Sequence, residues 1–451
     1  MNFIPPQDEG RLRAAASGVL PNGKPVIVNA DGTVSVVGAA TLLDVGSQVV
    51  FEEAESTYIV SAFDSNLNKV LIAFADAGNS NHGTAIVGTI ASGAITFGSA
   101  AVFNAATTQV GGATFDSNSN KVVIAYKDGG NSNYGTAIVA TISGTSVSFG
   151  SEVVFTSNTL VVQTGITFND QDNKILIAYR IYDGSNNQGQ AIVGTVSSTS
   201  ISFGTAATFA SNTSVAYPSL IDVPSVAKCI LAYRDDGNSS HGTARVCMIS
   251  GTNVSFGTAV VYEAATTNFN WLSWDVEATR FVISYADAGN SHAATAIVGA
   301  VNTSNNTVSF GTAVVIEDLT ATVVRTVIAY DAQADGSNHV VVYRVGGDDK
   351  DLRSSVGTVD SSNNSITFTT PVEIHNNINS TNFALVYDSN SNIFTTSYSD
   401  SGNSNHGTSQ LLTVSSTNLT SENYIGMSGG AVDFDIASET LGSASVFESA
   451  S

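Results

Sequence analysis

The side chains best able to do chemistry in this sequence recur in a turn of the form D-x-G-N-S. Five copies keep its three diagnostic residues: Asp76, Gly78 and Asn79; Asp128, Gly130 and Asn131; Asp235, Gly237 and Asn238; Asp287, Gly289 and Asn290; and Asp400, Gly402 and Asn403. A calcium site needs several oxygen ligands that converge in one loop, whereas this pattern guarantees one carboxylate per copy. We therefore expect a structural turn, in which the aspartate accepts backbone amides and the glycine supplies a positive φ. Neither a metal nor a cofactor is predicted.

Histidine and cysteine are common metal ligands, but their placement predicts structural roles. One equivalent position after the turn is held in different copies by His82, Tyr134, Gln188, His241, Ala293 and His406. Histidines in separate copies cannot converge on one ion, so we expect each ring to pack against its own turn or to hydrogen-bond there. Cys229 and Cys247 flank the turn of a single copy. Buried thiols are the favoured interpretation, and a cross-strand disulfide is the alternative.

The arginines and carboxylates do not form a recognisable catalytic pattern. Arg180, Arg234 and Arg344 share a position after an aromatic residue in three copies, and we interpret them as solvated charges at a rim. A glycosidase needs two carboxylates at a fixed separation, and no such pair stands out. The prediction is a protein that is not an enzyme.

These residues belong to a repeat that fills most of the chain. Three landmarks each occur seven times, roughly every fifty residues: the end of a string such as SVSFGTAVVF, an Asp or Asn after an apolar stretch, and an aromatic residue after a second apolar run. One copy contains four segments rich in Val, Ile, Thr and aromatic residues, separated by Asn, Asp, Gly and Ser. Four antiparallel strands in about fifty residues make one propeller blade.

The order of the landmarks predicts how the repeats close. A string typical of a fourth strand, residues 32–51, precedes the first complete repeat, and the seventh repeat lacks one. Pairing this N-terminal strand into the last repeat would complete it and remove exposed sheet edges. We predict an all-β fold, a seven-bladed β-propeller of four-stranded antiparallel blades over residues 33–414. An open β-solenoid is the alternative. Residues 1–32 are an N-terminal extension with a short β-hairpin, and residues 415–451 are a C-terminal extension that could dock to a partner.

One face of such a propeller carries both the D-x-G-N-S turns and the connections between blades. Loops on a rigid scaffold commonly carry function, so this face is the candidate binding face. Its aromatic residues, which a glycan-binding surface would use, are Tyr182, Tyr217, Phe269 and Trp271, with packing as the alternative role. The first strands, such as residues 110–115, offer small and apolar side chains to the centre of the ring.

Composition excludes several classes of protein. The chain has 451 residues, of which 16 are basic and 38 acidic, and its formal net charge is −22. That balance argues against nucleic-acid binding, which needs clustered Lys and Arg. No apolar run is long enough to insert into a membrane. The opening MNFIPPQDEGRLR lacks the apolar core of a signal peptide, so we expect synthesis without export by that route.

Three segments resemble repeat-containing β-propeller virion structural proteins of marine tailed phages. They are AAASGVLPNGKPVIVNADGTVSVV, the iterated DSNSNKVVIAYKDGGNSNYGTAIV followed by SFGT, and SENYIGMSGG. The resemblance implies a virion location as a tail fibre, spike or capsid appendage, with a role in host-surface attachment or particle assembly. The implied partners are other virion proteins, a host-surface glycan or protein, and further copies of the chain. A secreted bacterial adhesin or lectin-like carbohydrate-binding module is the alternative. A carbohydrate-active propeller enzyme is disfavoured because its acid and arginine constellations are missing.

Overall fold

The computed structural model describes residues 26–28, 34–36 and 41–416, with gaps at 157–159, 183–186, 212–213, 225, 318–321, 333–336, 347–349, 377 and 379–382. The chain divides into two units, one of residues Leu43–Thr413 and one of the end segments Met1–Leu42 and Val414–Ser451. Within the end segments, β1 (Val26–Val28) pairs antiparallel with β2 (Val34–Val36), which agrees with the expected hairpin. Residues 417–451 of the predicted C-terminal extension lie outside the described residues.

The unit Leu43–Thr413 is built from antiparallel strands that follow the sequence repeat. Three long strands run from one repeat into the next: β4 (Val49–Asp64), β8 (Ala101–Asp116) and β22 (Val260–Asp275). Elsewhere the same path is split into β12 (Val153–Val154) and β13 (Leu160–Asn169), β17 (Ala207–Ala210) and β18 (Val215–Val223), β26 (Val314–Glu317) and β27 (Val323–Tyr330), and β31 (Val372–His375) and β32 (Phe383–Asp388). A short strand, β3 (Thr41–Val45), precedes β4.

The remaining strands complete each repeat. The second strands are β5 (Lys69–Asp76), β9 (Lys121–Asp128), β14 (Lys174–Tyr182), β19 (Lys228–Asp235), β23 (Arg280–Asp287), β28 (Asn338–Val345) and β33 (Ile393–Asp400). The third strands are β6 (His82–Ala91), β10 (Tyr134–Ser143), β15 (Asn187–Ser197), β20 (His241–Ser250), β24 (Ala293–Asn302), β29 (Leu352–Asp360) and β34 (His406–Ser416). Short outer strands are β7 (Ala94–Phe97), β11 (Ser146–Phe149), β16 (Ser200–Phe203), β21 (Asn253–Phe256), β25 (Thr307–Phe310) and β30 (Ser365–Phe368).

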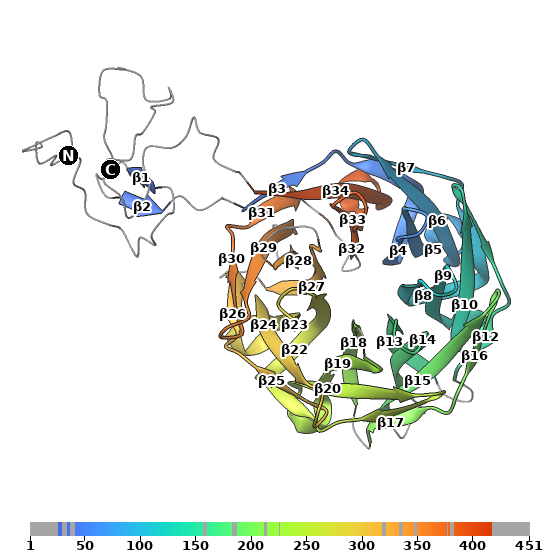
Figure 1. Ribbon diagram of the computed structural model, residues 1–451. Coiled ribbons are helices and arrows are strands. Elements are labelled where there is room, and N and C mark those ends of the chain that lie inside the picture. The colour runs from blue at the N-terminus through green and yellow to red at the C-terminus, as the bar shows by residue number, and fades with distance from the viewer. Residues whose placement is uncertain are drawn as a thin grey trace, which may run out of the picture. The chain divides into compact units, whose positions relative to one another are not determined.

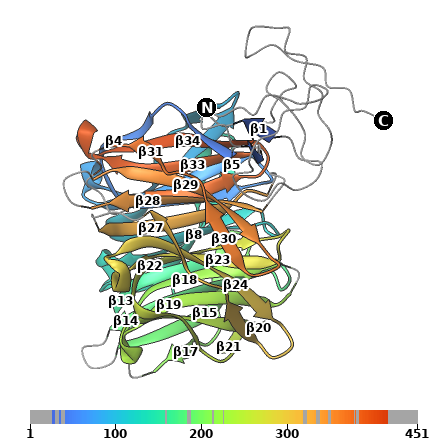
Figure 2. The same cartoon turned by 90° about the vertical axis from the view of Figure 1, so that its left-hand side faces the viewer.

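The strand groups are arranged around a common axis, with the first strands innermost (Figure 1). Figure 2 shows the same groups from the side. In the second repeat, β8 pairs with β9, β9 with β10, and β10 with both β11 and β12, and all four pairings are antiparallel. The fold is therefore all-β and propeller-like. None of the described elements is a long apolar helix of the kind that crosses a membrane.

The N-terminal strand β4 pairs with the third strand of the last repeat. Thr408 of β34 lies opposite Val50, just as Thr84 of β6 lies opposite Val102 at the junction of the first two repeats. Two further bonds hold the preceding segment to β34: the Gly46 amide donates to the Leu411 carbonyl at 2.8 Å, and the Gln410 side chain donates to the Gly46 carbonyl at 3.1 Å. The first and last repeats are thus joined by the same ladder that joins neighbouring repeats.

Aromatic side chains fill the space between neighbouring repeats. Phe103, at the end of one repeat, packs against two rings of the next repeat. Its ring centre lies 5.2 Å from that of Tyr126 on the second strand and 5.7 Å from that of Phe149 on the outer strand. The same contact recurs at Phe51, Phe155, Phe209 and Tyr262. The second strands are buried almost throughout, because repeats cover both of their faces. Three buried tyrosine hydroxyls of the described residues each donate to a glutamate: Tyr126 to Glu152 at 2.8 Å, Tyr285 to Glu263 at 3.0 Å and Tyr343 to Glu317 at 2.6 Å.

The two cysteines face each other across one hairpin. Cys229 on β19 is the register partner of Cys247 on β20, and both are fully buried and free. Burial raises the pKa of both thiols, which keeps them protonated. The interpretation as buried thiols is therefore confirmed.

The pairing of β4 with β34 predicts a specific truncation effect. Removal of residues 1–51 would delete Phe51 and the residues at Val49 and Val50 that pair with β34. We expect the midpoint of thermal unfolding to fall by several degrees or more, because burial of Phe51 alone is worth about 3–5 kcal/mol. Removal of residues 1–40, which leaves β3 and β4 intact, serves as the control and should preserve the wild-type midpoint. Equal melting of the two truncations would contradict the closing role of β4.

Candidate functional site

A β-bulge interrupts the first strand of most repeats near its start. The register of the pairing with the second strand shifts at equivalent places: Thr57/Val60, Val110/Gly112, Val161/Gln163, Ala216/Ser219, Asn268/Trp271 and Val323/Arg325. A bulge bends a strand and re-aims the side chains next to it. Because the first strands are innermost (Figure 1), the bulges surround the axis of the ring.

Three of the bulges hold an aromatic residue in the left-handed backbone region. Tyr58, Tyr217 and Phe269 have φ values of 52°, 53° and 55°. This conformation costs an aromatic residue roughly 1–3 kcal/mol, and such strain gathers at functional sites. The same conformation in three repeats therefore marks the inner rim of the ring as a candidate site.

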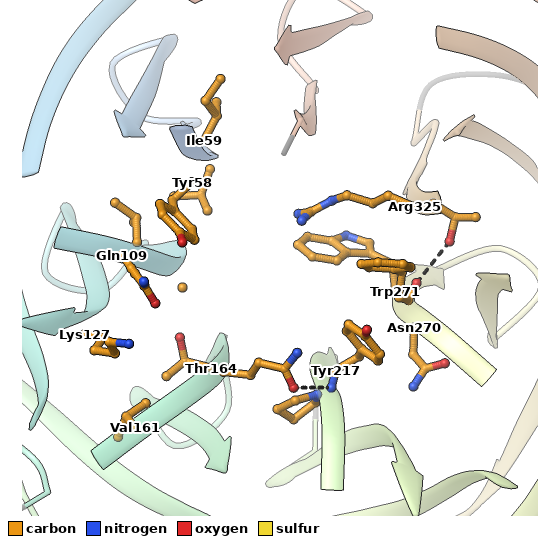
Figure 3. A pocket seen from close by; sticks show the side chains of 17 residues that line it. Tyr58, Ile59, Gln109, Lys127, Val161, Thr164, Tyr217, Asn270, Trp271 and Arg325 are labelled. Atoms are coloured by element: carbon orange, nitrogen blue, oxygen red, sulfur yellow. Dashed lines mark hydrogen bonds between the residues drawn. The ribbon is translucent and has the colours of Figure 1, made fainter. Parts of the chain in front are cut away.

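A cavity of about 340 Å³ opens at this rim, between the first strands of the first six repeats. Its lining includes the strained aromatic residues, Trp271, and several polar side chains. Figure 3 shows Tyr58 and Gln109 on one side of the cavity and Trp271 and Arg325 on the opposite side. A second cavity of about 210 Å³ is lined mostly by small and apolar residues, and it shares with the first cavity Ile59, Val60, Gly111, Thr164, Pro218 and Trp271. The sequence predicts small and apolar side chains at the centre of the ring, and the lining of this second cavity agrees with that prediction.

Aromatic rings and the side chain of Arg325 lie along one wall of the larger cavity. The ring centres of Tyr217 and Phe269 lie 4.5 Å apart. The guanidinium of Arg325 lies 5.7 Å from the centre of the Trp271 ring and 5.6 Å from that of Phe383. These distances are those of cation–π contacts, in which a ring attracts a positive charge. The wall therefore presents a large apolar face beside a cation.

Hydrogen bonds to backbone groups hold two of the bulges in place. The Gln163 side-chain oxygen accepts from the Tyr217 amide at 2.8 Å, and the Thr326 hydroxyl donates to the Phe269 carbonyl at 3.1 Å (Figure 3). Each bond joins one repeat to the next, so the bulge geometry depends on the placement of the neighbouring strand. The cavity is therefore pre-formed by contacts within the protein.

Two cations contribute to the cavity. Burial lowers the pKa of Lys127 from its ordinary value, and burial lowers the pKa of Arg325 to about 10, while Tyr217 opposes the change at Arg325. Both shifts reflect the loss of water around a positive charge. An arginine with this pKa remains charged at neutral pH.

Three of the four predicted ligand-facing aromatic residues, Tyr217, Phe269 and Trp271, line this cavity together. Tyr182 is 44% exposed at the end of β14 and is not among the lining residues. Sequence reasoning missed Tyr58, Gln109, Gln163, Lys127 and Arg325. A signal did exist, because Tyr58, Phe269 and Arg325 each lie six residues before the Asp landmark of their repeat.

The D-x-G-N-S turns form one-turn 3₁₀ helices capped by their aspartates. These are η1 (Ala77–Asn79), η2 (Gly129–Asn131), η3 (Asp236–Asn238), η4 (Ala288–Asn290) and η5 (Ser401–Asn403). Asp128 accepts from the Gly130 amide at 2.8 Å, and Asp287 accepts from the Gly289 amide at the same distance. The aspartate role is therefore as predicted.

The predicted role of the turn glycines is wrong. The positive φ values belong to the two residues after the asparagine, such as Ser80 and Asn81 at 56° and 59°. At Gly78 a Cβ would lie 2.6 Å from the Cβ of Ala54, and Gly130 and Gly289 meet the same kind of neighbour. At these three positions the glycine is needed because another strand path approaches closely.

The turn histidines lie in separate repeats. His82, His241 and His406 each begin the third strand of their own repeat, where they are partly exposed. The described residues hold no group of three or more His, Cys, Asp or Glu side chains arranged for a metal ion.

The three arginines that follow the second-strand aromatic residue differ in their surroundings. Arg234 forms an ion pair with Asp236 at 2.7 Å, and Arg180 is half-buried. Arg344 is only 6% exposed and donates to the Ile378 carbonyl at 2.8 Å. The interpretation as solvated rim charges is therefore wrong for Arg344, because its side chain is buried and bonded to a backbone carbonyl that lies between the sixth and seventh repeats.

A Ser–His–Asp arrangement lies buried between the fifth and sixth repeats. The Ser273 hydroxyl is 2.8 Å from Nδ1 of His339, and Asp275 is 3.3 Å from Nε2. All three residues are at most 3% exposed, so no substrate reaches them. Other repeats place apolar residues at the His339 position, for example Val70 and Val122. The arrangement therefore contributes to packing rather than to catalysis.

Comparison with known proteins gives matches of low sequence identity. No family model matches the chain, and no curated protein matches it. A mutant of AofleA from Arthrobotrys oligospora is 11% identical, with a TM-score of 0.46, and the match covers 81% of this chain and 97% of that one. A mutant of NanB sialidase from Streptococcus pneumoniae is 10% identical, with a TM-score of 0.46 and coverages of 82% and 71%. A protein from Lactobacillus plantarum is 12% identical, with a TM-score of 0.48 and coverages of 79% and 94%. Similarities this weak carry no argument about function.

The buried histidine predicts a loss of stability in acid. Burial lowers the pKa of His339, while Asp275 and Asp331 oppose this. The pKa of Asp275 is also lowered. Burial would raise this pKa, but hydrogen bonds from His339 and the Ala278 amide lower it by more. The folded protein therefore binds protons less readily than the unfolded chain, and the free energy of unfolding should fall as pH drops below about 6.5. Urea titrations from pH 7 to pH 5 should show a smaller fall for His339→Val.

The variant Ser273→Ala is the matched control for this measurement. It removes one hydrogen-bond partner of the ring and keeps the titratable group, so its stability should be lower but should keep the wild-type dependence on pH. An unchanged pH dependence in His339→Val would contradict the assignment.

The turn glycines allow a paired test of close approach. In Gly78→Ala the new Cβ would meet Ala54 at 2.6 Å, whereas in Gly402→Ala it would meet only Asp400, at 3.2 Å. We expect Gly78→Ala to lower the free energy of unfolding by about 1–3 kcal/mol and Gly402→Ala to have a much smaller effect. Equal urea midpoints for the two variants would show that the close approach of Ala54 is not the reason for a glycine at position 78.

Proposed function

We propose that this chain is a non-enzymatic attachment protein of a tailed-phage virion, and that its axial cavity binds a glycan on the host surface. We further propose that its architecture is a seven-bladed β-propeller closed by the N-terminal strand. The pairing of β4 with β34 in the register used between neighbouring repeats supports this architecture over an open solenoid. An open solenoid would leave these two strands as free edges.

The observation that carries the proposed function is the wall of aromatic residues facing polar side chains. A sugar ring has apolar faces formed by C–H groups and an edge of hydroxyl groups. Trp271, Tyr217 and Phe269 offer surfaces on which such a face can stack, and Gln109, Gln163 and Asn270 line the same cavity. A cavity of about 340 Å³ also falls in the range of small-ligand pockets.

The cavity's composition favours binding over hydrolysis. Glycosidases commonly use two carboxyl groups that flank the bond to be broken. The described residues that line the cavity include no Asp or Glu. A bound sugar would therefore be held without the acid and base that its cleavage requires.

The virion location rests on the sequence resemblance to phage repeat proteins. A secreted bacterial adhesin would use the same cavity and the same chemistry, so the location is a separate question. Imaging of the parent particle with a labelled antibody against this chain separates the two. Label on the capsid or the tail supports a virion protein, and particles without label contradict it.

Substitution of Trp271 tests the cavity as the binding site. We expect Trp271→Ala to weaken glycan binding by about tenfold or more, because a large stacking surface is lost. Tyr182→Ala is the matched control, since Tyr182 is an exposed aromatic residue outside the cavity lining. Binding would be measured on a glycan array and by calorimetry, with thermal melting to verify folding. Equal binding by wild type and Trp271→Ala would place the site elsewhere.

A further inference from the structure

The second cavity adjoins the proposed glycan site. Several residues line both cavities, and Trp271 is one of them. A sugar ring that stacks on the Trp271 indole therefore lies at the boundary between the two cavities. One substituent of that ring is then the part of the ligand that is placed to enter the second cavity, whose volume is about 210 Å³.

The lining of the second cavity is uncharged and largely apolar. The described residues that line it include no Asp, Glu, Lys, Arg or His. Those that it does not share with the larger cavity include Gly112, Ala113, Gly165, Ile166 and Leu220. An apolar cavity of about 150 Å³ holds a benzene molecule, so the second cavity has room for a substituent of a few non-hydrogen atoms. A charged group would lose its water there without gaining a partner of opposite sign, so the lining favours a small neutral substituent.

Two glutamine side chains line the larger cavity close in sequence to this boundary. Gln109 lies two residues before the shared Gly111 on β8, and Gln163 lies directly before the shared Thr164 on β13. The Gln163 oxygen accepts from the Tyr217 amide at 2.8 Å, so its NH₂ group is what it offers to a ligand. Gln109 has no hydrogen-bond partner among the described residues, so its side chain offers both a donor and an acceptor.

An acetamido group matches these neighbours. Its carbonyl oxygen accepts from an NH₂ group, its N–H donates to an amide oxygen, and its methyl group is small and apolar. Figure 3 shows Gln109 across the cavity from Trp271, so a sugar ring on the indole has the Gln109 amide in front of it. A sugar hydroxyl in the same place would leave the second cavity unfilled. A free amino group would bring a positive charge against an uncharged lining.

We infer that the ligand of the larger cavity is an N-acetylated amino sugar, whose acetamido group bonds to Gln109 and Gln163 and places its methyl group in the second cavity. This inference rests on the proposed glycan-binding function and adds the chemical class of the ligand. Trp271 holds the sugar ring, the two glutamines recognise the amide, and the second cavity measures the size of the acyl group.

The test compares glycans that differ at a single substituent, on the full chain. The probes end in a 2-acetamido sugar, in the same sugar with an N-formyl group, or in the parent sugar with a hydroxyl group at that carbon. The N-formyl glycan keeps the amide and lacks the methyl group, so it separates hydrogen bonding from filling of the second cavity. An array identifies the binders, and calorimetry measures each affinity.

The matched variants are Gln109→Met and Gln171→Met. The first removes the amide of a cavity residue and keeps a side chain of similar length. The second makes the same change at an exposed glutamine in the turn after β13, which lines neither cavity. Thermal melting verifies the folding of both variants, and the three glycans decide the question on the wild-type chain if Gln109→Met does not fold.

We expect the N-acetyl glycan to bind at least about tenfold more tightly than its hydroxyl parent. The N-formyl glycan should bind about fourfold more weakly than the N-acetyl glycan, which is the effect of one buried methyl group. Gln109→Met should remove most of the preference for the N-acetyl glycan over its parent, and Gln171→Met should keep it.

The two levels of the proposal fail in different ways. A hydroxyl parent that binds as tightly as the N-acetyl glycan, with binding that Trp271→Ala weakens, would overturn the acetamido ligand and leave the proposed function standing. Equal binding of the N-formyl and N-acetyl glycans would overturn the placement of the methyl group in the second cavity. An array on which no glycan binds would overturn the proposed function, and the acetamido ligand with it.

Discussion

The aromatic contact between neighbouring repeats is the interaction on which the rest of the structure depends. Five of the repeat boundaries carry a ring that reaches into the next repeat, as Phe103 does against Tyr126 and Phe149, and the buried side chains of Ile316 and Ile374 take the same place at the other two. A single four-stranded group has two faces to cover and cannot cover them with its own side chains. Burial of an aromatic side chain is worth a few kcal/mol, and here it is repeated around the ring. The contact therefore sets the spacing of the repeats and brings their first strands toward a common axis.

That convergence creates the candidate site. The first strands approach so closely that a side chain at Gly111 would collide with Thr164 of the next repeat. The bulges of six first strands turn larger residues, such as Tyr58 and Trp271, toward the axis. The result is a narrow centre beneath a wider mouth, where aromatic and polar residues from several repeats meet. No one repeat contains enough of these residues to make a binding site.

The charge of the protein has two different physical roles. Many of the acidic residues bond to nearby backbone groups, as Asp116 does to the amides of Asn118 and Ser119 at 3.0 Å. Such aspartates stabilise turns and lie away from the axial cavity. The cavity instead gathers cations and hydrogen-bond donors. A net charge of −22 therefore describes the scaffold and not the site.

The sequence by itself determined the repeat, the strand pattern, the capped turns and the pairing expected of the N-terminal strand. Each of these depends on local patterns, such as alternation, turn residues and the order of landmarks. Three of the four aromatic residues chosen from the sequence also meet at the cavity. Only the tertiary structure brought Lys127 and Arg325 to that cavity, because they lie on different strands of distant repeats. Their meeting depends on the curvature of the whole ring and on bulges that shift the register by one residue. Local sequence patterns report neither quantity. The close approach at Gly78 and the enclosure of Arg344 were decided in the same way, by neighbours far away in the sequence.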